Sequence, residues 1–168
     1  MKKIIFILCL LSCTLTYSQV GITYSTDDTS SVDKIVNAMY NVISGPAGQR
    51  DWQRFKNLFT SDAKMGAVFK NKQNVLVYKS FSPDDYIKNN DPYFLENAFI
   101  EKEIHRTVNT FGQIVNVFTT YESETGGEKQ RGINSLELVY SGNRWWIASL
   151  IWQDETKENP LPKEYLDE

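Results

Sequence analysis

The side chains best suited to acid–base chemistry lie on one short stretch of the sequence, Glu101 to His105. His105 is the only histidine, and histidine has an unperturbed pKa near neutral pH, so it is a candidate general acid or base. Alternation along a strand would place it on the same face as Glu101, Glu103 and Thr107. Glu103 is therefore its candidate catalytic partner. The alternative is a histidine that only hydrogen-bonds across the sheet.

The same stretch is poorly suited to bind a metal ion. Same-face Cα atoms on a strand are about 6.6 Å apart, from a rise of ~3.3 Å per residue, so Glu101, Glu103 and His105 do not converge on one ion. Both cysteines, Cys9 and Cys13, lie within the first 19 residues, which we interpret below as a signal segment, so the mature domain would have no thiol to bind a metal. The sequence contains no phosphate-binding loop and no dinucleotide-binding fingerprint. We expect no metal and no cofactor.

Two further charged residues are candidates for the site. Asp51 would either face the mouth of a pocket as a second catalytic carboxylate or cap the helix that begins at Trp52. Arg131 would either anchor an acidic ligand or pair with Glu122, and a surface ion pair contributes only about 0–1 kcal/mol. The sequence leaves both alternatives open.

Three predicted helices would help to position these residues. Apolar residues recur at helical spacing from Val32 to Ile43, after a capping box formed by Ser30 and Asp33. A second helix begins near Asp51 and has an apolar face made of Trp52, Phe55, Leu58 and Phe59.

The third helix begins at Ser82, and Pro92 must break or kink it because proline lacks the N–H of an interior helical bond. Before this helix, the strand-like runs 65–69 and 75–78 flank a polar turn. They predict a β-hairpin.

From residue 98 onward the apolar residues alternate with a period of two, which indicates strands. Four long strands are predicted, at residues 99–110, 113–123, 131–140 and 144–153. The short glycine-containing links between them require antiparallel neighbours. Helices followed by a meander of strands indicate an α+β fold.

The last predicted strand is largely apolar on both faces. Its two alternating sets are Trp146, Ala148, Leu150 and Trp152, and Trp145, Ile147, Ser149 and Ile151. Only one set can cover the helices, and the other would leave a large apolar patch in water. We therefore predict a symmetric homodimer through the outer faces of the sheet, with the last two strands central.

The first residues have the parts of a secretory signal: two lysines, a short apolar run, and small residues before a cut. A cut before Gln19 makes residues 1–18 the signal peptide and residues 19–29 a flexible leader, and residues 156–168 form an acidic, mobile tail. The apolar run is shorter than the roughly 20 residues of a transmembrane helix. We expect an exported protein, periplasmic or secreted. Lipoprotein processing at Cys13 is the alternative.

Composition narrows the class of protein further. The length of 168 residues fits one domain, and 13% aromatic residues exclude a disordered chain. A net charge of −3 provides no basic surface for nucleic acid.

Five segments carry a family resemblance: residues 45–59, 101–106, 121–123, 131–138 and 144–147. They resemble the bacterial nuclear transport factor 2-like (SnoaL-like) domains, over about residues 31–155. The resemblance implies an α+β domain, residues 30–155, whose N-terminal helices pack in a strongly curved mixed or antiparallel sheet to form a cone. It also implies a mostly apolar pocket at the open end and homodimers through the sheet.

Ketosteroid isomerase is one relative that allows a comparison by residue. It uses a tyrosine of the first helix and a strand carboxylic acid as donors, and an aspartate as base. Tyr40 and Asn134 match the two donor positions, but the base position falls in residues 65–68, which contain no carboxylate. The resemblance implies two donors that hold a carbonyl group without an isomerase base.

The predicted ligand-binding residues are mainly aromatic: Tyr40, Trp52, Phe55, Trp146 and Trp152, together with Asn134 and Arg131. We expect an exported small-molecule-binding domain, with a small apolar or carbonyl-containing ligand and no assigned catalysis. One alternative is a lyase, isomerase or hydrolase that uses His105 with Glu103 or Asp51. Another is a protein–protein interaction module.

Overall fold

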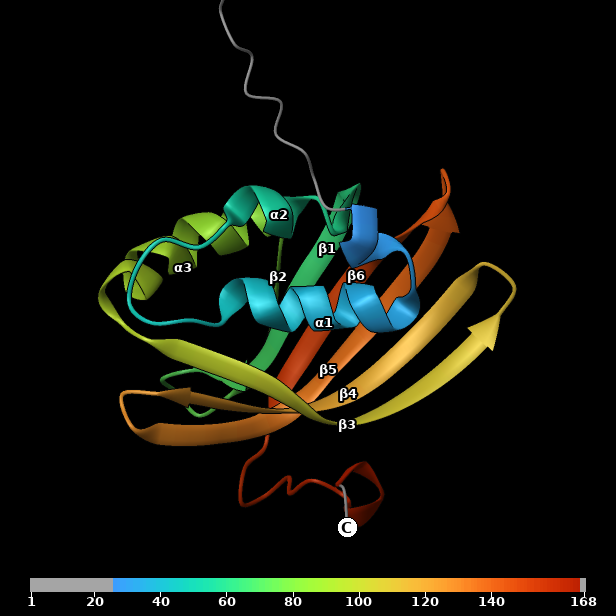
Figure 1. Ribbon diagram of the computed structural model, residues 1–168. Coiled ribbons are helices and arrows are strands. Elements are labelled where there is room, and N and C mark those ends of the chain that lie inside the picture. Colours follow the sequence, from blue (N-terminus) through green and yellow to red (C-terminus); the bar gives the residue numbers. More distant parts are fainter. Residues whose placement is uncertain (1–25, 167–168) are drawn as a thin grey trace, which may run out of the picture.

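The computed structural model describes residues 26–166 of the chain (Figure 1). The predicted signal peptide, both cysteines and the predicted leader up to residue 25 lie outside these residues. Within the described part, no helix is long and apolar enough to cross a membrane.

The described residues form an α+β domain. Its helices are α1 (Val32–Ile43), α2 (Trp52–Lys56) and α3 (Pro83–Glu96). Its strands are β1 (Phe59–Lys70), β2 (Leu76–Phe81), β3 (Phe99–Phe111), β4 (Ile114–Thr125), β5 (Glu128–Ser141) and β6 (Arg144–Asp154). Two short 3₁₀ helices flank them, η1 (Thr26–Thr29) and η2 (Lys163–Tyr165).

The strands form one mixed sheet in the order β2-β1-β6-β5-β4-β3. Strands β3 to β6 form the predicted antiparallel meander, and β1 and β2 form the predicted hairpin. Strand β1 also pairs with β6 in parallel. This parallel contact joins the beginning and the end of the sheet-forming sequence, because β2, α3 and β3 to β5 all lie between these two strands in the chain.

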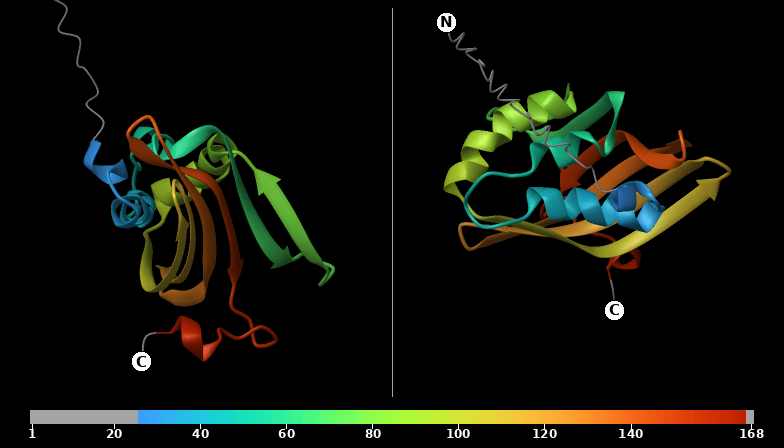
Figure 2. Two further views of the ribbon diagram at one scale, coloured as in Figure 1. Left: turned by 90° about the vertical axis from the view of Figure 1, so that its right-hand side faces the viewer. Right: turned by 45° about the horizontal axis from the view of Figure 1, so that its top comes forward.

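The sheet curls around the helices to form a cone, with α1 lying across the concave face (Figure 2). Side chains of α1 and of the central strands are fully buried in the core, among them Ile35, Val36, Val117, Leu136 and Ile147. The predicted fold class is confirmed.

Helix α1 is capped one residue later than predicted. The Ser31 hydroxyl accepts a hydrogen bond from the Lys34 amide at 3.2 Å, while the Ser30 hydroxyl donates to the Asp27 carbonyl. The Asp33 carboxylate, expected in a capping box, instead pairs with Arg106 of β3 at 2.6 Å. A tertiary ion pair thus replaces the predicted local bond.

Helix α2 ends at Lys56, before the predicted Leu58 and Phe59. Phe59 begins β1, where it is in register with Ile147, yet its ring still lies 4.9 Å from that of Phe55. The strand therefore provides the same aromatic contact that helical spacing predicted.

Helix α3 has the predicted capping box between Ser82 and Asp85, but Pro92 does not break it. The helix continues to Glu96, and Phe94 in its last turn is buried and stacked on Trp52. Pro92 lacks the N–H for an interior helical hydrogen bond. The packing of Phe94 on Trp52 offsets the loss of that bond and stabilises the last turn of the helix.

Two β-bulges decide which side chains face the inside of the cone. In β3, Glu103 pairs with Tyr121 but His105 pairs with Thr120, so one extra residue, Ile104, lies between them. In β6, the register skips Ala148 in the same way. Each bulge moves every later side chain to the opposite face.

The bulge at Ala148 corrects the predicted faces of the last strand. The inner set is Trp145, Ile147, Leu150 and Trp152, and the outer set is Trp146, Ser149 and Ile151. Most of the large apolar side chains of β6 therefore lie on the inner face of the sheet. The Arg144 guanidinium lies 3.7 Å from the ring centre of Trp146, so the outer tryptophan is partly covered by its own strand.

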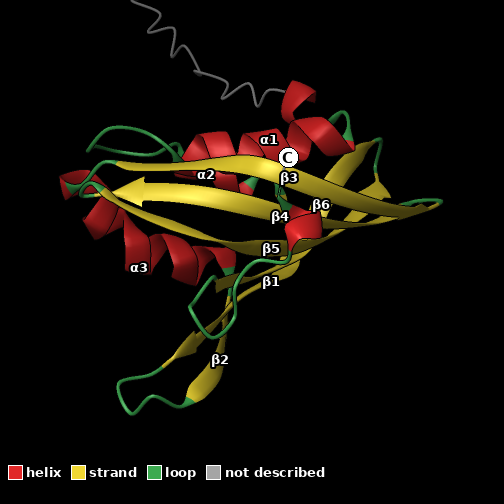
Figure 3. Cartoon of the chain, turned by 90° about the horizontal axis from the view of Figure 1, so that it is seen from below, coloured by secondary structure: helices red, strands yellow, loops and turns green. Residues whose placement is uncertain are grey.

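The C-terminal segment crosses the outer face of the sheet (Figure 3). The Thr120 hydroxyl donates to the Tyr165 carbonyl at 2.7 Å, and the Tyr165 ring lies 5.2 Å from that of Phe118. Residues 159–165 and the sheet border a second, partly open cavity of about 320 Å³, whose walls include Ile133 and Ile151. The region predicted as an exposed acidic tail thus covers part of the outer face.

Candidate functional site

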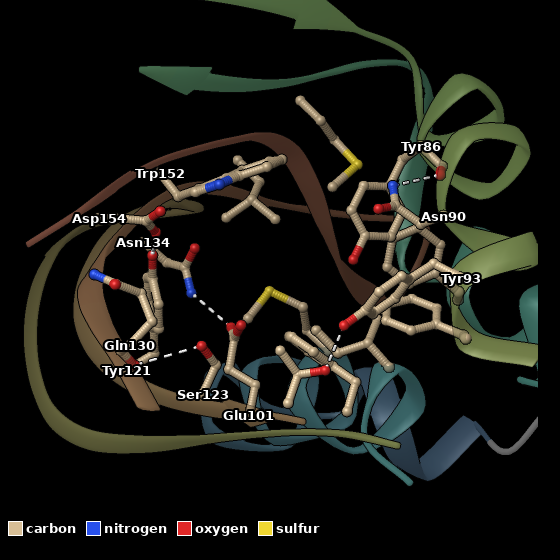
Figure 4. Close-up of a pocket in the computed structure, with 18 residues that line it drawn as sticks. Tyr86, Asn90, Tyr93, Glu101, Tyr121, Ser123, Gln130, Asn134, Trp152 and Asp154 are labelled. Atoms are coloured by element: carbon tan, nitrogen blue, oxygen red, sulfur yellow. Dashed lines mark hydrogen bonds between the residues drawn. The ribbon is translucent and has the colours of Figure 1, made fainter. Parts of the chain in front are cut away.

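The cone holds a cavity of about 340 Å³ between α3 and the concave face of the sheet (Figure 4). Its apolar walls come from all three helices and from β1, β3 and β6; they are Met39, Ile43, Phe55, Met65, Phe94, Phe99, Leu150 and Trp152. Mostly apolar walls with a few convergent polar groups are typical of small-molecule sites.

Polar side chains gather at the end of the cavity formed by the sheet. They come from β3, β4, β5 and β6, and we call them the polar end: Glu101, Tyr121, Ser123, Gln130, Asn134 and Asp154. The Asn134 amide donates to the Glu101 carboxylate at 3.3 Å, and the Tyr121 hydroxyl donates to the Asp154 carboxylate. Two carboxylates therefore lie among the polar groups at one end of a cavity whose walls are mostly apolar.

A chain of buried hydrogen bonds supports Asn134 from behind. The Asn134 amide also donates to the Tyr40 hydroxyl at 3.1 Å, and that hydroxyl lies 3.1 Å from the Thr119 hydroxyl. Thr119 in turn donates to Glu103 at 2.6 Å, and Arg106 donates to Glu103 at 2.7 and 2.5 Å. Because the Glu103 carboxylate only accepts, every donor in this chain points toward it.

The environment of Glu101 favours its neutral form. Burial raises its pKa to about 7, the hydrogen bond from Asn134 opposes this, and the charge of Asp154 adds to it. Burial also raises the pKa of Tyr121, and the nearby Asp154 carboxylate adds to this effect. The polar end can therefore change its charge near neutral pH through Glu101.

Helix α3 forms the opposite side of the cavity with Tyr86, Asn90 and Tyr93 (Figure 4). The Tyr93 and Thr125 hydroxyls are 2.5 Å apart and join α3 to the end of β4. The Tyr86 hydroxyl has no hydrogen-bond partner among the described residues, and burial raises its pKa. It is available to a molecule in the cavity.

Three of the predicted ligand-binding residues line this cavity: Phe55, Asn134 and Trp152. Tyr40 lies one layer behind, against Asn134. Trp52 packs between the helices, with its ring 5.7 Å from Phe94 and its indole N–H bonded to Asp91 at 2.5 Å. That these residues contact a ligand stays a prediction.

The Tyr40 and Asn134 side chains, matched to the isomerase donors, do lie together, 3.1 Å apart. Met65 lines the cavity near the position of the isomerase base, and residues 65–68 contain no carboxylate. However, the Tyr40 hydroxyl and both N–H groups of Asn134 already have protein partners. The predicted pair of free donors for a carbonyl group is therefore not present.

Three other predicted residues lie elsewhere for identifiable reasons. Trp146 is on the outer face, because the bulge at Ala148 puts Leu150 and Trp152, which follow it, on the face opposite to Trp146. Arg131 pairs with Glu155 at 2.8 Å, not with Glu122. Asp51 is the exposed N-cap of α2 and accepts from the Arg54 amide at 2.9 Å, which is the capping alternative.

The predicted pair of His105 and Glu103 is not assembled. The bulge at Ile104 puts His105 on the outer face, where its ring lies 6.3 Å from that of Tyr165. Glu103 is on the inner face but is held by Arg106 and Thr119. Among residues 26–166, no group of three potential metal ligands lies close enough to bind one ion.

Three polar residues that line the cavity, Glu101, Tyr121 and Asp154, are not among the ligand-binding residues predicted from the sequence. A signal for Glu101 was present, because alternation places it on the same face as the apolar Phe99. For Tyr121 and Asp154 the signal is Gly132, which lies opposite both in the sheet. A Cβ at Gly132 would overlap the Tyr121 hydroxyl and the Gln153 carbonyl oxygen, so glycine makes room for this pair.

No protein-family model matches the sequence, and no curated protein matches it. Solved structures do match the fold. A cystatin-like protein of unknown function from Nostoc punctiforme aligns with a TM-score of 0.57 at 4% identity, over 75% of this chain and 90% of that chain. The β subunit of a candidate aromatic-ring-hydroxylating dioxygenase from Novosphingobium aromaticivorans aligns with a TM-score of 0.57 at 12% identity, over 76% and 88%.

A candidate ketosteroid isomerase from Parabacteroides distasonis aligns with a TM-score of 0.54 at 12% identity, over 75% of this chain and 89% of that chain. Identities this low relate the folds and not the activities. This chain has a curved mixed sheet that wraps around its helices and leaves a cavity inside, as the sequence resemblance predicted. The fold of this chain is that of the nuclear transport factor 2-like domains.

Proposed function

We propose that this domain binds a small molecule in the cone cavity, with an apolar body against the aromatic walls and a polar group at the polar end. The observation that carries the proposal is the cavity of about 340 Å³, in which Glu101, Asn134 and Asp154 line one end and apolar side chains line most of the remainder. A cone filled by its own side chains would favour the protein–protein interaction alternative, and this cone is not filled.

The enzymatic alternative loses its main support. His105 lies on the opposite face of the sheet from the cavity, so it cannot reach a bound molecule directly or through one water. Fold neighbours with different names share the architecture, so the fold alone does not choose an activity. Binding without assigned catalysis is the function that the site supports best.

Export and dimerisation accompany this proposal as expectations from the sequence. We propose an exported protein, cleaved before Gln19, that self-associates through the part of the outer face that residues 156–166 leave open. The side chains of that face include Trp146 and Val139.

Ligand binding is tested with N-phenyl-1-naphthylamine, a neutral apolar dye whose fluorescence rises in apolar sites. We expect saturable binding by the wild-type protein. Asn90→Trp, on the cavity side of α3, should weaken binding about tenfold or more by filling the cavity. Asn89→Trp is the matched control, because Asn89 is exposed and does not line the cavity. No saturable binding, or equal effects of both variants, would overturn the proposal.

A further inference from the structure

The donors at the polar end of the cavity are all engaged within the protein. The Tyr121 hydroxyl donates to Asp154, and the Ser123 hydroxyl donates to the Gln130 carbonyl at 3.4 Å. The Gln130 amide donates to the carbonyls of Arg131 and Glu155, at 2.9 Å each. When Glu101 is ionised, a ligand that needs hydrogen bonds from this end therefore finds no free donor.

Asn134 is held in one orientation by the chain of hydrogen bonds behind it. Since Thr119 donates to Glu103 and Tyr40 donates to Thr119, the Asn134 NH₂ group must face Tyr40 and Glu101. The carbonyl oxygen of the Asn134 side chain is thereby left without a partner among the described residues. The supporting layer thus turns Asn134 into an acceptor toward the cavity.

The two carboxylates add further acceptors. One oxygen of Glu101 and one oxygen of Asp154 accept no hydrogen bond from any described residue. Among residues 26–166, no lysine, arginine or histidine lines the cavity. The guanidinium of Arg50, which acts on Tyr86 of α3 by its charge, donates to the carbonyls of Ile43, Gly45, Pro46 and Gly48. The negative charge at the polar end therefore has no counter-ion in the part of the chain that the structure describes.

We propose that the ligand is a cationic amine on an apolar, aromatic-sized body, with its ammonium group at Glu101, Asp154 and Asn134. An ammonium group is a donor without acceptors and carries the charge that these carboxylates lack. The aromatic walls, including Trp152 and Tyr86, also favour a cation near their faces. This inference rests on the proposed function and specifies its ligand class.

The same groups predict how amine binding depends on pH. The titratable or charged groups that face Glu101 are Tyr40 of α1, Tyr86 of α3, Tyr121 of β4 and Asp154 of β6, with Arg50 beyond Tyr86. Burial raises the pKa values of the three tyrosines above the ordinary value, so they stay neutral at pH 8. Amine binding should therefore strengthen as Glu101 ionises around pH 7.

The test compares three probes with one ring system: 2-naphthylmethylamine, 2-naphthylmethanol and 2-naphthoate. Each displaces N-phenyl-1-naphthylamine from the wild-type protein at pH 8. We expect the amine to bind about tenfold more tightly than the alcohol, and the carboxylate to bind most weakly, as for a charge-assisted pair. The amine's advantage over the alcohol should shrink at pH 5.5.

Glu101→Gln should reduce the amine's advantage at least about fivefold, while Glu124→Gln, the same change at an exposed position of β4, should leave it intact. The amine assignment is overturned if the wild-type protein binds the amine less than about fivefold more tightly than the alcohol. It is also overturned if Glu101→Gln leaves this ratio of dissociation constants unchanged. If Glu101→Gln does not fold, the wild-type comparison at the two pH values decides. Failure of the dye itself to bind would instead overturn the proposed function.

Discussion

Glu101 and His105 are four residues apart on β3 and lie on opposite faces of the sheet, because Ile104 is an extra residue in the ladder between Glu103 and His105. Glu101 lines the cone cavity, whereas His105 lies beside Tyr165 of the C-terminal segment. A single bulge thus separates the two side chains that strict alternation would bring to one face. The carboxylate belongs to the candidate site and the imidazole does not.

His105→Ala should leave ligand binding unchanged. The imidazole is on the outer face, so the dissociation constant of N-phenyl-1-naphthylamine should stay within about twofold of the wild-type value. Dye titration at pH 7 measures this, with Asn90→Trp as the positive control. A tenfold loss of binding in His105→Ala would show that the outer face reaches the cavity.

Glu101→Gln should change the pH dependence of stability. The folded-state pKa is raised from 4.5 to about 7, so the folded protein holds this proton over a range where the unfolded chain has lost it. Wild-type stability therefore falls as the pH rises from about 4.5 to about 7, and Gln removes this loss. The variant should gain about 1–3 kcal/mol over the wild type between pH 4.5 and pH 8.

Urea unfolding at several pH values measures this gain, with Glu124→Gln as the exposed control. A difference between variant and wild type that is constant across this pH range would mean that Glu101 is not buried as described.

Gly132→Ala should destabilise the domain and disturb the polar end. The new Cβ would overlap the Gln153 carbonyl oxygen, which is backbone and cannot move freely, as well as the Tyr121 hydroxyl. We expect a loss of about 1–3 kcal/mol in the free energy of unfolding. Gly45→Ala is the control, since its Cβ would meet Arg50 only at an ordinary 3.5 Å. Equal losses in the two variants would contradict the close approach at Gly132.

Removal of residues 156–168 should increase self-association. The C-terminal segment covers part of Phe118 and Ile133, and without it this apolar surface meets water. Sedimentation equilibrium should give a higher average mass for the truncated protein than for the whole protein at the same micromolar concentration. A truncated protein that stays folded and monomeric would show that this face does not drive dimerisation.

Much of the fold follows from local features of the sequence. Glycine-containing links and a period of two predict the meander of β3 to β6, and the Ser82 capping box predicts the start of α3. These features depend on residues close together in the chain, so their physical causes are visible in the sequence. Phe55 and Trp152 were placed among the candidate site residues as aromatic side chains of a predicted helix and strand, whereas Asn134 was placed there by the family resemblance.

The tertiary structure decided which face of the sheet each side chain of β3 and β6 lies on. A bulge depends on how two strands pair, and nothing at Ile104 or Ala148 alone indicates that a partner strand will skip it. Because of the bulges at these two residues, His105 and Trp146 lie on the outer face of the sheet and not in the candidate site.

The convergence of Glu101 with Asp154 was likewise decided in three dimensions. The two carboxylates come from β3 and β6, which are separated by two other strands in the sheet, and only the curl of the sheet brings them to one cavity. The raised pKa of Glu101 follows from that burial and from the charge of Asp154. Sequence determined the residue types and the strands that carry them; sheet curvature and strand register determined their chemistry.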